Sequence, residues 1–589
     1  MELTPVERHW ALGPVLAVCL GAISNLVLYT SYATGDDVGL RMITEGRFVP
    51  GGAPSAETHF MSLVMGWLLV SLHAFSSTIP WFDLILNGAI LSAFLLSITL
   101  LQKRADILFR PCLAIICASF LWMLVFPTFT VAAVVSAGVG ALVLTFSGVG
   151  WLPDIRRIER FLILGLSSVA MVVGFLLREI AALAGVIVVA IVVASALVAR
   201  IPVRRGSLIA ASCLSGVAVI ACLVAHQCEA AYYTLRPEWG QFTLFNIERA
   251  RISNATSSGL TADNDRDDAG NGFSHDDEIA IQQSLYFDKS VFPAERVIKA
   301  GQYYASRRLD PKALVIQLFD EARQAVTAAP LILGLLVFTW MRRPASREGL
   351  GTIASVVAIT VLFLLLAIAF KSTPWRVVWP LSTALFVGAS ALPFQAIQTA
   401  PDRIGGGRTI LTGLAAFIFC MTILDDVLVW RRFSDLPAEI AKLEAMRLGV
   451  IVAVGSAIPY QHLDLPFHRS VIQHPISILP VGVYFRSPVV QRMIAGSQYA
   501  DLASHVCGDR YLPVALTPKA VPAFVTYYRH HHHLDVQFNR LTEASTFAIY
   551  RCRILRVAHG DPQRTTISMP GRVGHRALTS WADTFQSGL

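Results

Sequence analysis

The sequence predicts an α-helical polytopic membrane protein with about eleven transmembrane helices, followed by a soluble α/β domain. The first observation is composition. Of the 589 residues, 54% are hydrophobic and only 15% are charged, whereas a soluble domain has roughly 45–50% apolar and about 25% charged residues. The second is that apolar runs long enough to cross the ~30 Å hydrocarbon layer as helices of ~20 residues recur along the chain. An ordinary soluble enzyme is thereby excluded.

The apolar runs give the positions of the expected spans. They lie at residues 11–31, 81–101, 108–126, 131–150, 161–177, 180–199, 207–226, 327–341, 350–370, 376–397 and 409–429. No small-residue cleavage pattern follows the first apolar core, so we expect a retained helix and not a signal peptide. The rest of the chain is too long for connections alone. We therefore expect a membrane domain over 1–429, with external loops 32–80 and 227–326, and an extracytoplasmic α/β domain over 430–589.

Orientation follows from the basic residues, because cytoplasmic loops carry the excess of Lys and Arg. The net charge is 48 − 40 = +8. The short loops on one side of the eleven-span arrangement hold Lys103, Arg104, Arg110, Arg156, Arg157, Arg160, Arg200, Arg204, Arg205, Arg342, Arg343, Arg347, Arg403 and Arg408. That side is predicted to be the cytoplasm, together with the N-terminus. Because these residues form no single patch, nucleic acid is not an expected partner.

The segment 60–75 is apolar but short for a span. A span here would place Asp36 and Asp37 in the cytoplasm. The length of the segment and its polar end, where Ser71 and His73 precede Pro80, favour a helix that lies in the membrane interface.

The first external loop predicts a short helix with two adjacent carboxylates at the membrane surface. Thr34 or Asp36 can cap it, acidic side chains occupy its first turn, and Gly46 can end it. Its apolar face, with Val38, Met42 and Ile43, is expected to lie against the bilayer. Asp36 and Asp37 could also do no more than cap and solubilise this helix.

Two stretches carry a resemblance to a known family. The first is GDDVGLRMITEG at 35–46, followed by F60MSLVMGWLL and I79PWF; the second is G272FSHDDEIAIQQSLYFDKSVFP. With an acidic pair after the first span, interfacial helices and a soluble C-terminal domain, the chain resembles the GT-C superfamily of polytopic membrane glycosyltransferases, in particular multipass bacterial members.

The resemblance implies an inverting transfer of a sugar from a polyprenyl-phosphate donor. The acceptor would be a glycan, a lipid or a cell-envelope component on the extracytoplasmic side of the bacterial inner membrane. An acidic residue of the first external loop would act as general base, with Asp36 the first choice and Asp37 the second. Repulsion between two carboxylates and partial desolvation raise the pKa of one of them toward a useful range.

Such a reaction needs cations for the leaving phosphate. Arg178, Lys371 and Arg376 are expected at external helix ends and are assigned to the donor phosphate. Snorkelling to the interface would explain the same three residues. The acceptor is assigned to His59 and Glu57 of the first loop and to His275, Asp276 and Asp277 of the second resembling stretch, where helix N-capping is the competing explanation.

The C-terminal region reads as a helix in SDLPAEIAKLEAMRLG and strands at V450IVAVG, S477ILPVGVYF, L512PVALT and F547AIYRCRIL. His530 to His533 cannot all point at one tetrahedral metal, so we expect an exposed turn. Cys507 and Cys552 face an oxidising compartment in this topology and can pair. No metal site is assigned and no cofactor is firmly predicted, with a divalent cation, Mg²⁺ or Mn²⁺, left open.

Three other functions stay open. A glycan polymerase or ligase would use a lipid-diphosphate donor and would place essential Arg and His residues in a large external loop, and the 227–326 loop keeps it possible. A transporter of lipid-linked glycans would show broken helices and mid-membrane charges, of which the spans carry few. A non-enzymatic assembly factor is the third. Membrane lipids are expected partners of the protein under each of these functions.

Overall fold

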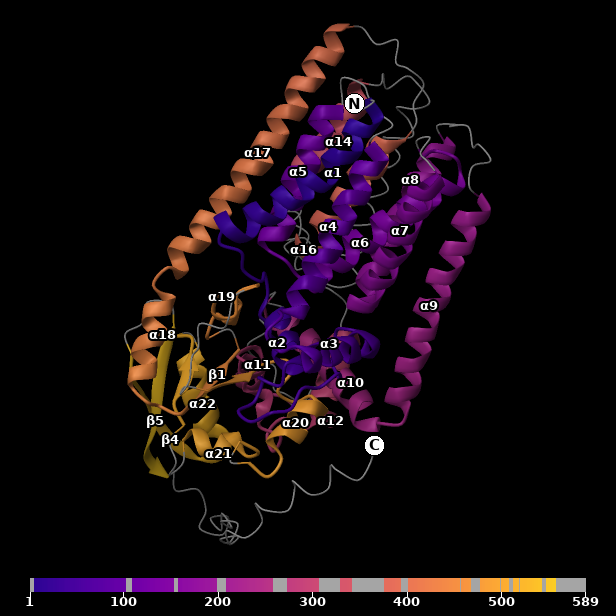
Figure 1. The fold of residues 1–589 in the computed structure, drawn as a ribbon. Coiled ribbons are helices and arrows are strands. Elements are labelled where there is room, and N and C mark those ends of the chain that lie inside the picture. The colour runs from indigo at the N-terminus through magenta and orange to yellow at the C-terminus, as the bar shows by residue number, and fades with distance from the viewer. Residues whose placement is uncertain are drawn as a thin grey trace.

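The computed structural model describes residues 5–101, 109–152, 157–198, 208–257, 273–306, 329–341, 375–392, 401–455, 457–467, 477–497, 499–507, 512–518, 520–542 and 547–557. A bundle of long helices occupies one end of the molecule. Shorter helices and a small sheet gather at the other end (Figure 1). The predicted fold class, a helical membrane protein with a C-terminal α/β region, is confirmed.

The helices of the bundle follow the predicted spans closely. They are α1 (Pro5–Ala22) with a π-helical turn (Ile23–Val27), α4 (Trp81–Leu101), α5 (Phe109–Val125), α6 (Phe129–Gly148), α7 (Arg157–Leu177), α8 (Glu179–Val198), α9 (Leu208–Thr234), α14 (Ala329–Met341), α16 (Trp375–Ala391) and α17 (Pro401–Phe433). Within the described residues, six helices are long and apolar enough to cross a membrane. The predicted span at 350–370 lies outside the described residues.

Helix α6 is the centre of the bundle. Its apolar window is 94% buried, and α4, α7, α8 and α16 pack around it. Glycines permit the close approach of its neighbours: a Cβ atom added at Gly185 of α8 would lie 2.4 Å from the carbonyl oxygen of Val134 in α6. Small residues at helix contacts are typical of membrane bundles, where association depends on close packing.

Both predicted helices of the first external loop are present. They are α2 (Gly35–Thr44), which ends just before Gly46, and α3 (Leu63–Phe75), whose N-cap Ser62 accepts a hydrogen bond from the backbone of Val64. At ~1.5 Å per residue, the 13 residues of α3 are too short to cross ~30 Å of hydrocarbon, which agrees with an interfacial helix.

The expected contact of α2 with the bilayer is wrong. Val38 and Ile43 are 1% and 0% exposed, because this face of α2 packs into the protein. The loop folds under other chain segments, so its apolar residues are covered by protein and not by lipid.

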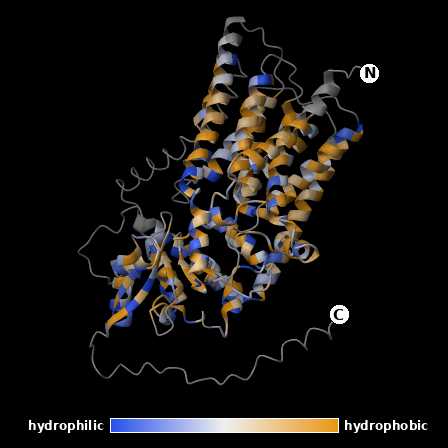
Figure 2. Ribbon diagram, turned by 60° about the vertical axis from the view of Figure 1, so that its left-hand side comes forward, coloured by the Kyte–Doolittle hydropathy of each residue, from blue (hydrophilic) through white to orange (hydrophobic). Residues whose placement is uncertain are grey.

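The large loop after α9 also folds at the α2 end of the molecule. It contains α10 (Pro237–Ser257), α11 (His275–Gln282), a 3₁₀ turn (Leu285–Phe287) and α12 (Ala294–Ser306), with α12 packed along α10. Helices α9 and α17 run along opposite margins of the bundle toward this end (Figure 1). Apolar residues dominate the bundle, while the other end mixes polar and apolar residues (Figure 2).

The C-terminal region forms a five-stranded mixed sheet in the order β2-β1-β3-β5-β4. The strands are β1 (Val450–Val454), β2 (Ser477–Val481), β3 (Val514–Leu516), β4 (Leu534–Arg540) and β5 (Ala548–Val557). The first three are parallel, with Val452 opposite both Leu479 and Val514, and β5 is antiparallel to β3 and β4. The four predicted strands are confirmed, and β4 is an addition.

Helices cover both faces of this sheet. They are α18 (Leu436–Ala445), the predicted helix, and α19 (Tyr460–Leu463), α20 (Pro488–Ile494), α21 (Leu502–Val506) and α22 (Ala520–His532). A side-chain cap, which the sequence also indicated for α18, is absent at the N-cap residue Asp435. Alternate residues of β1 point to opposite faces, so Ile451 packs with α18 while Val452 joins the apolar core shared with the membrane helices. The core is therefore continuous between the sheet and the bundle.

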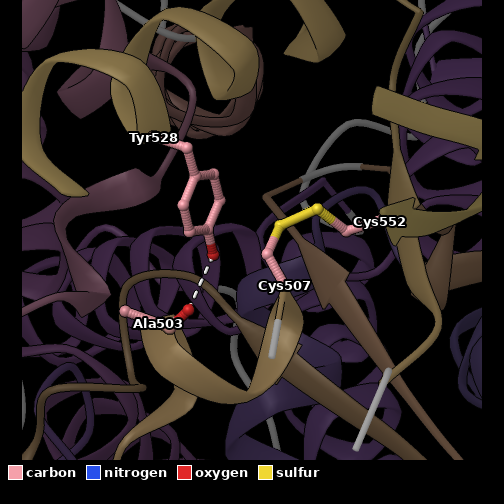
Figure 3. The surroundings of a disulfide bond; sticks show 4 residues. All are labelled: Ala503, Cys507, Tyr528 and Cys552. Carbon is pink, nitrogen blue, oxygen red and sulfur yellow. Dashed lines mark hydrogen bonds between the residues drawn. A yellow bond between two sulfur atoms is a disulfide. The ribbon is translucent and has the colours of Figure 1, made fainter. Parts of the chain in front are cut away.

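Cys507 and Cys552, whose pairing the sequence left open, form a disulfide. The disulfide joins the end of α21 to β5, with 5.0 Å between the Cα atoms (Figure 3). Beside it, the Tyr528 hydroxyl of α22 donates to the Ala503 carbonyl at 2.8 Å (Figure 3). The disulfide and this hydrogen bond together hold α21 between β5 and α22.

Packing around α6 gives a stability prediction. Gly185→Ala places a methyl group against the α6 backbone and is expected to cost about 1–3 kcal/mol, lowering Tm in detergent by several degrees. Gly165→Ala in α7 is the matched control, because a Cβ atom there meets nothing within 4 Å. Equal Tm values for the two variants would contradict the close packing of α6 and α8.

Candidate active site

Asp37 fastens α2 to the start of α6. Its side chain is fully buried: Oδ1 accepts from the backbone N–H of Phe129 at 2.8 Å, and Oδ2 accepts from the Thr34 hydroxyl at 2.6 Å. Thr34 stands at the N-cap position of α2 but makes no side-chain cap bond. Phe129 is the first residue of α6, where a carboxylate also interacts favourably with the helix dipole.

The environment of Asp37 favours its neutral form. Burial raises the pKa of this carboxyl group to about 7, although hydrogen bonds from Thr34 and Phe129 and the charge of Arg376 oppose the rise. The neighbouring Asp36 adds to it. The predicted rise in the pKa of one member of the acidic pair is thus present, and burial is its main cause.

Asp36 has the more open position. It is partly exposed and lines a cavity of about 350 Å³ between α2, Arg249 of α10, the turn at Ser284 and Tyr286, and the C-terminal region. Of the two adjacent carboxylates, Asp36 is therefore the one that a molecule in the cavity can reach.

Two of the three predicted phosphate-binding residues lie close to the acidic pair. Arg178, in the break between α7 and α8, interacts electrostatically with Asp36, Asp37 and Arg376. Its guanidinium donates to the Thr130 hydroxyl at 2.6 Å and lies 5.0 Å from the ring centre of Phe129. Arg376 is the second residue of α16 and interacts with Asp37. Lys371 lies outside the described residues.

Tyr484, from the C-terminal region, completes the wall beside Asp36. Its hydroxyl donates to the Asp36 backbone carbonyl at 3.3 Å, and its ring packs edge-on against Phe48 and Phe60. A Cβ atom at Gly39 of α2 would lie 2.6 Å from this ring, so glycine is required for the contact. The C-terminal region is thereby in direct contact with the helix that bears the acidic pair.

A buried ion pair connects α2, α4 and residues 465–467 of the C-terminal region. Arg41 of α2 donates to the Leu465 carbonyl and pairs with Asp83 of α4, each at 3.3 Å. Asp83 also accepts from Tyr32 and, at 2.9 Å, from the backbone N–H of Phe467. Charges removed from water are stabilised only when they are paired in this way. The network holds residues 465–467 at the N-terminal end of α4, where Asp83 lies.

The predicted acceptor residues of the first loop occupy two different places. His59 packs against Phe60 and Phe242, near Arg178 and Arg249; burial, with these two charges, lowers the pKa of its imidazole to about 4. It is therefore neutral at neutral pH. Glu57 is buried elsewhere and pairs with Arg236, at 2.6 Å, and with Arg492 of α20.

Asp276 and Asp277 form an interface with α22 and do not line the cavity. Asp276 pairs with His530 at 3.3 Å and Asp277 with His531 at 2.7 Å. His275 begins α11, and its side chain lies outside the described part of the chain. Ser274 and Asp277 form a capping box, so the expected N-capping is present.

The expected exposed turn at the histidine run is wrong. Residues 530–532 form the last turn of α22, and only His533 has a left-handed backbone. The side chains of His531 and His532 are only 24% and 25% exposed, because they face Asp277 and Asp288. Within the described residues, no group of three or more His, Cys, Asp or Glu side chains is arranged to hold a metal ion.

Comparisons with known proteins find solved structures that are similar to this chain. No family model matches the chain, and no curated protein matches it. A crystal structure of ArnT from Cupriavidus metallidurans in the apo state is similar, with 15% sequence identity and a TM-score of 0.40, over 92% of this chain and 97% of that chain. The structure of ArnT bound to undecaprenyl phosphate has 14% identity and a TM-score of 0.37 over the same shares.

Sequence reasoning missed several residues around the site. Asp83 had a signal, since a carboxylate in the first turn of a span is costly unless it is paired. Arg41 and Glu45 also had one, because they are spaced i,i+4 on a helix and form an ion pair at 3.0 Å. Tyr484 and Arg249 had none, because only the tertiary fold brings them to Asp36.

The pKa of Asp37 gives a prediction about stability and pH. A carboxyl whose folded pKa is raised from 3.8 to about 7 binds more protons in the native state between these values, so stability falls as pH rises through this window. Asp37→Asn keeps an acceptor for Phe129 and should remove this part of the fall, measured as Tm at about pH 5 and about pH 8. Asp37→Ala should lower Tm at both. An unchanged pH dependence in Asp37→Asn would contradict the assignment.

Proposed function

We propose that the protein is a membrane glycosyltransferase that moves a sugar from a polyprenyl-phosphate donor to an acceptor hydroxyl, with Asp36 as general base. One observation carries the proposal. Asp36 lines a cavity of about 350 Å³. Arg178 interacts electrostatically with Asp36, Asp37 and Arg376, and Arg376 interacts with Asp37, so two cations lie around the acidic pair that contains this base. The sequence resemblance to GT-C glycosyltransferases supports the same reaction.

The reaction uses these groups as follows. The acceptor oxygen attacks C1 of the donor sugar, and its proton passes to the Asp36 carboxylate. The bond between C1 and the phosphate oxygen breaks, and its electron pair stays with the departing polyprenyl phosphate. Arg178 and Arg376 stabilise the charge that develops on that phosphate. Attack from the side opposite the leaving group inverts the configuration at C1.

Burial favours Asp36 over Asp37 as the base. Both oxygens of Asp37 accept hydrogen bonds from the protein, and the side chain is 0% exposed. A general base must come within hydrogen-bond reach of the proton that it removes. Asp37 is therefore assigned to positioning, because it fixes the start of α2 and with it the backbone of Asp36.

The proposal places this reaction on the extracytoplasmic side of the bacterial inner membrane. Helices α2 and α3 of the first loop, helices α10, α11 and α12 of the large loop, and the C-terminal sheet lie at the same end of the bundle (Figure 1), which agrees with the side expected from the basic loops. The Cys507–Cys552 disulfide belongs to this end, and disulfides persist in oxidising compartments.

The first test is Asp36→Asn. Purified protein is incubated with radiolabelled sugars on polyprenyl phosphate and on polyprenyl diphosphate, with cell-envelope extracts as acceptor. Loss of the base should lower kcat by about 10²-fold or more, with little change in donor affinity. Asp435→Asn is the control, because Asp435 is exposed at the start of α18 and makes no cap bond. Normal transfer by Asp36→Asn, or transfer only from the diphosphate donors, would overturn the proposal.

Arg178 gives a second, separable prediction. Arg178→Gln removes one charge near the leaving phosphate and should both weaken binding of polyprenyl phosphate and lower kcat, by about tenfold or more. Arg178→Lys should recover part of the loss, since it restores the charge without the planar fork. Arg431→Gln, an exposed change near the end of α17, is the control. Unchanged binding of polyprenyl phosphate by Arg178→Gln would contradict the assignment.

A further inference from the structure

The cavity beside Asp36 has a second side that the transfer step does not use. Opposite α2, its wall is formed by Gly455 after β1, by Val481 at the end of β2, and by Ser284 and Tyr286 of the large loop. Strands β1 and β2 are parallel, so their carboxyl ends meet at one edge of the sheet. Clefts at the carboxyl ends of parallel strands are frequent ligand sites.

Two buried hydroxyl groups on this side have no hydrogen-bond partner among the residues that the structure describes. Tyr286 and Tyr460 both line the cavity, and their hydroxyl oxygens make no hydrogen bond to any described residue. Tyr286 is only 1% exposed. Buried polar groups are nearly always paired, so such hydroxyls indicate a partner that comes from a ligand or from water.

The same wall carries one cation, Arg249 of α10. Its Nε and Nη2 donate to the side-chain oxygen of Asn246 at 3.2 and 3.0 Å, and its guanidinium lies 5.0 Å from the ring centre of Tyr286. No carboxylate among the described residues pairs with it. The guanidinium is thus held in place at the cavity wall, without an ion-pair partner in the part of the chain that the structure describes.

Neighbouring arginines show how unusual this arrangement is. Arg251, two residues away, pairs with Glu248 at 2.6 Å, and Arg236 pairs with Glu57 at the same distance. Arg178 and Arg376 face the acidic pair. Arg249 instead lies over the Tyr286 ring at the wall of the cavity, and no ion pair joins it to a described carboxylate. An anionic group on a ligand would supply the missing partner, in a site where water competes little.

From this geometry we propose that the cavity is the acceptor site and that it selects an acidic sugar, one that carries a carboxylate or a phosphate. Arg249 pairs with the anionic group, while Tyr286 and Tyr460 hydrogen-bond to sugar hydroxyls. The sugar hydroxyl that faces Asp36 is the one that reacts. This inference rests on the proposed glycosyl transfer, and it adds the chemical class of the acceptor.

Binding can be tested without catalysis. Glucuronic acid, glucose 6-phosphate and glucose are titrated against the full-length protein in nanodiscs and followed by saturation-transfer NMR. At least one of the two acids should bind about tenfold more tightly than glucose. The acid that binds tells a carboxylate site from a phosphate site. Arg249→Gln should remove this preference, and Tyr286→Phe should weaken all three sugars while the preference persists.

Arg251→Gln is the matched control, on the same helix and outside the cavity lining, and it should bind like the wild type. Arg249→Lys guards against a folding defect: it keeps the charge and should keep part of the preference. Equal binding of acids and glucose by the wild type would overturn the inference. An undiminished preference in Arg249→Gln would do the same.

Transfer of labelled sugar to the same three compounds separates this inference from the proposed function. Transfer to glucose as fast as to the acids would refute acid selection and leave glycosyl transfer intact. If no donor supports transfer while the acids still bind through Arg249, glycosyl transfer is refuted and the anion site stands.

Discussion

The arrangement of the site depends on one buried contact, the Asp37 carboxylate on the first N–H group of α6. Helix α6 is the most enclosed helix of the bundle, so its N-terminus is a fixed point. Asp37 joins the first external loop to the N-terminus of α6. The backbone of the adjacent Asp36 is therefore held in one position. The cost of burying a carboxyl group is reduced by its raised pKa and by two hydrogen bonds. A rigid support of this kind is what positioned acid–base chemistry needs.

The second constraint is that the C-terminal region forms part of the candidate site. Tyr484 packs on Gly39, and the Arg41–Asp83 pair holds residues 465–467 against the N-terminal end of α4. Because the apolar core runs from the bundle into one face of the sheet, the two parts share their stability. The cavity lies between them, bounded by α2 on one side and by the strand ends on the other. Removing either part would open it.

Local patterns predicted the helices and four strands well, because apolar runs and alternations of apolar and polar residues are visible in the sequence. The distance between Cys507 and Cys552 is not, so the sequence left their pairing open. They also selected Asp36, Asp37, Arg178 and Arg376 as candidate site residues, since charges near apolar helices are few, and the roles of these four residues stay predictions. They failed where burial depends on distant segments. Val38 and Ile43 look like residues that face lipid, yet other segments cover them. The His530–His532 run meets aspartates more than 240 residues earlier in the chain, which no local pattern shows.

The central claim, that the acidic pair and the two arginines form a site for a polyprenyl phosphate, is tested most directly by a cryo-EM structure of the protein in nanodiscs with this lipid bound. The account predicts its phosphate between Arg178 and Arg376, with Asp36 facing the space where the sugar C1 would lie. Density for the phosphate at another place, with the two arginines and Asp36 unoccupied, would contradict it.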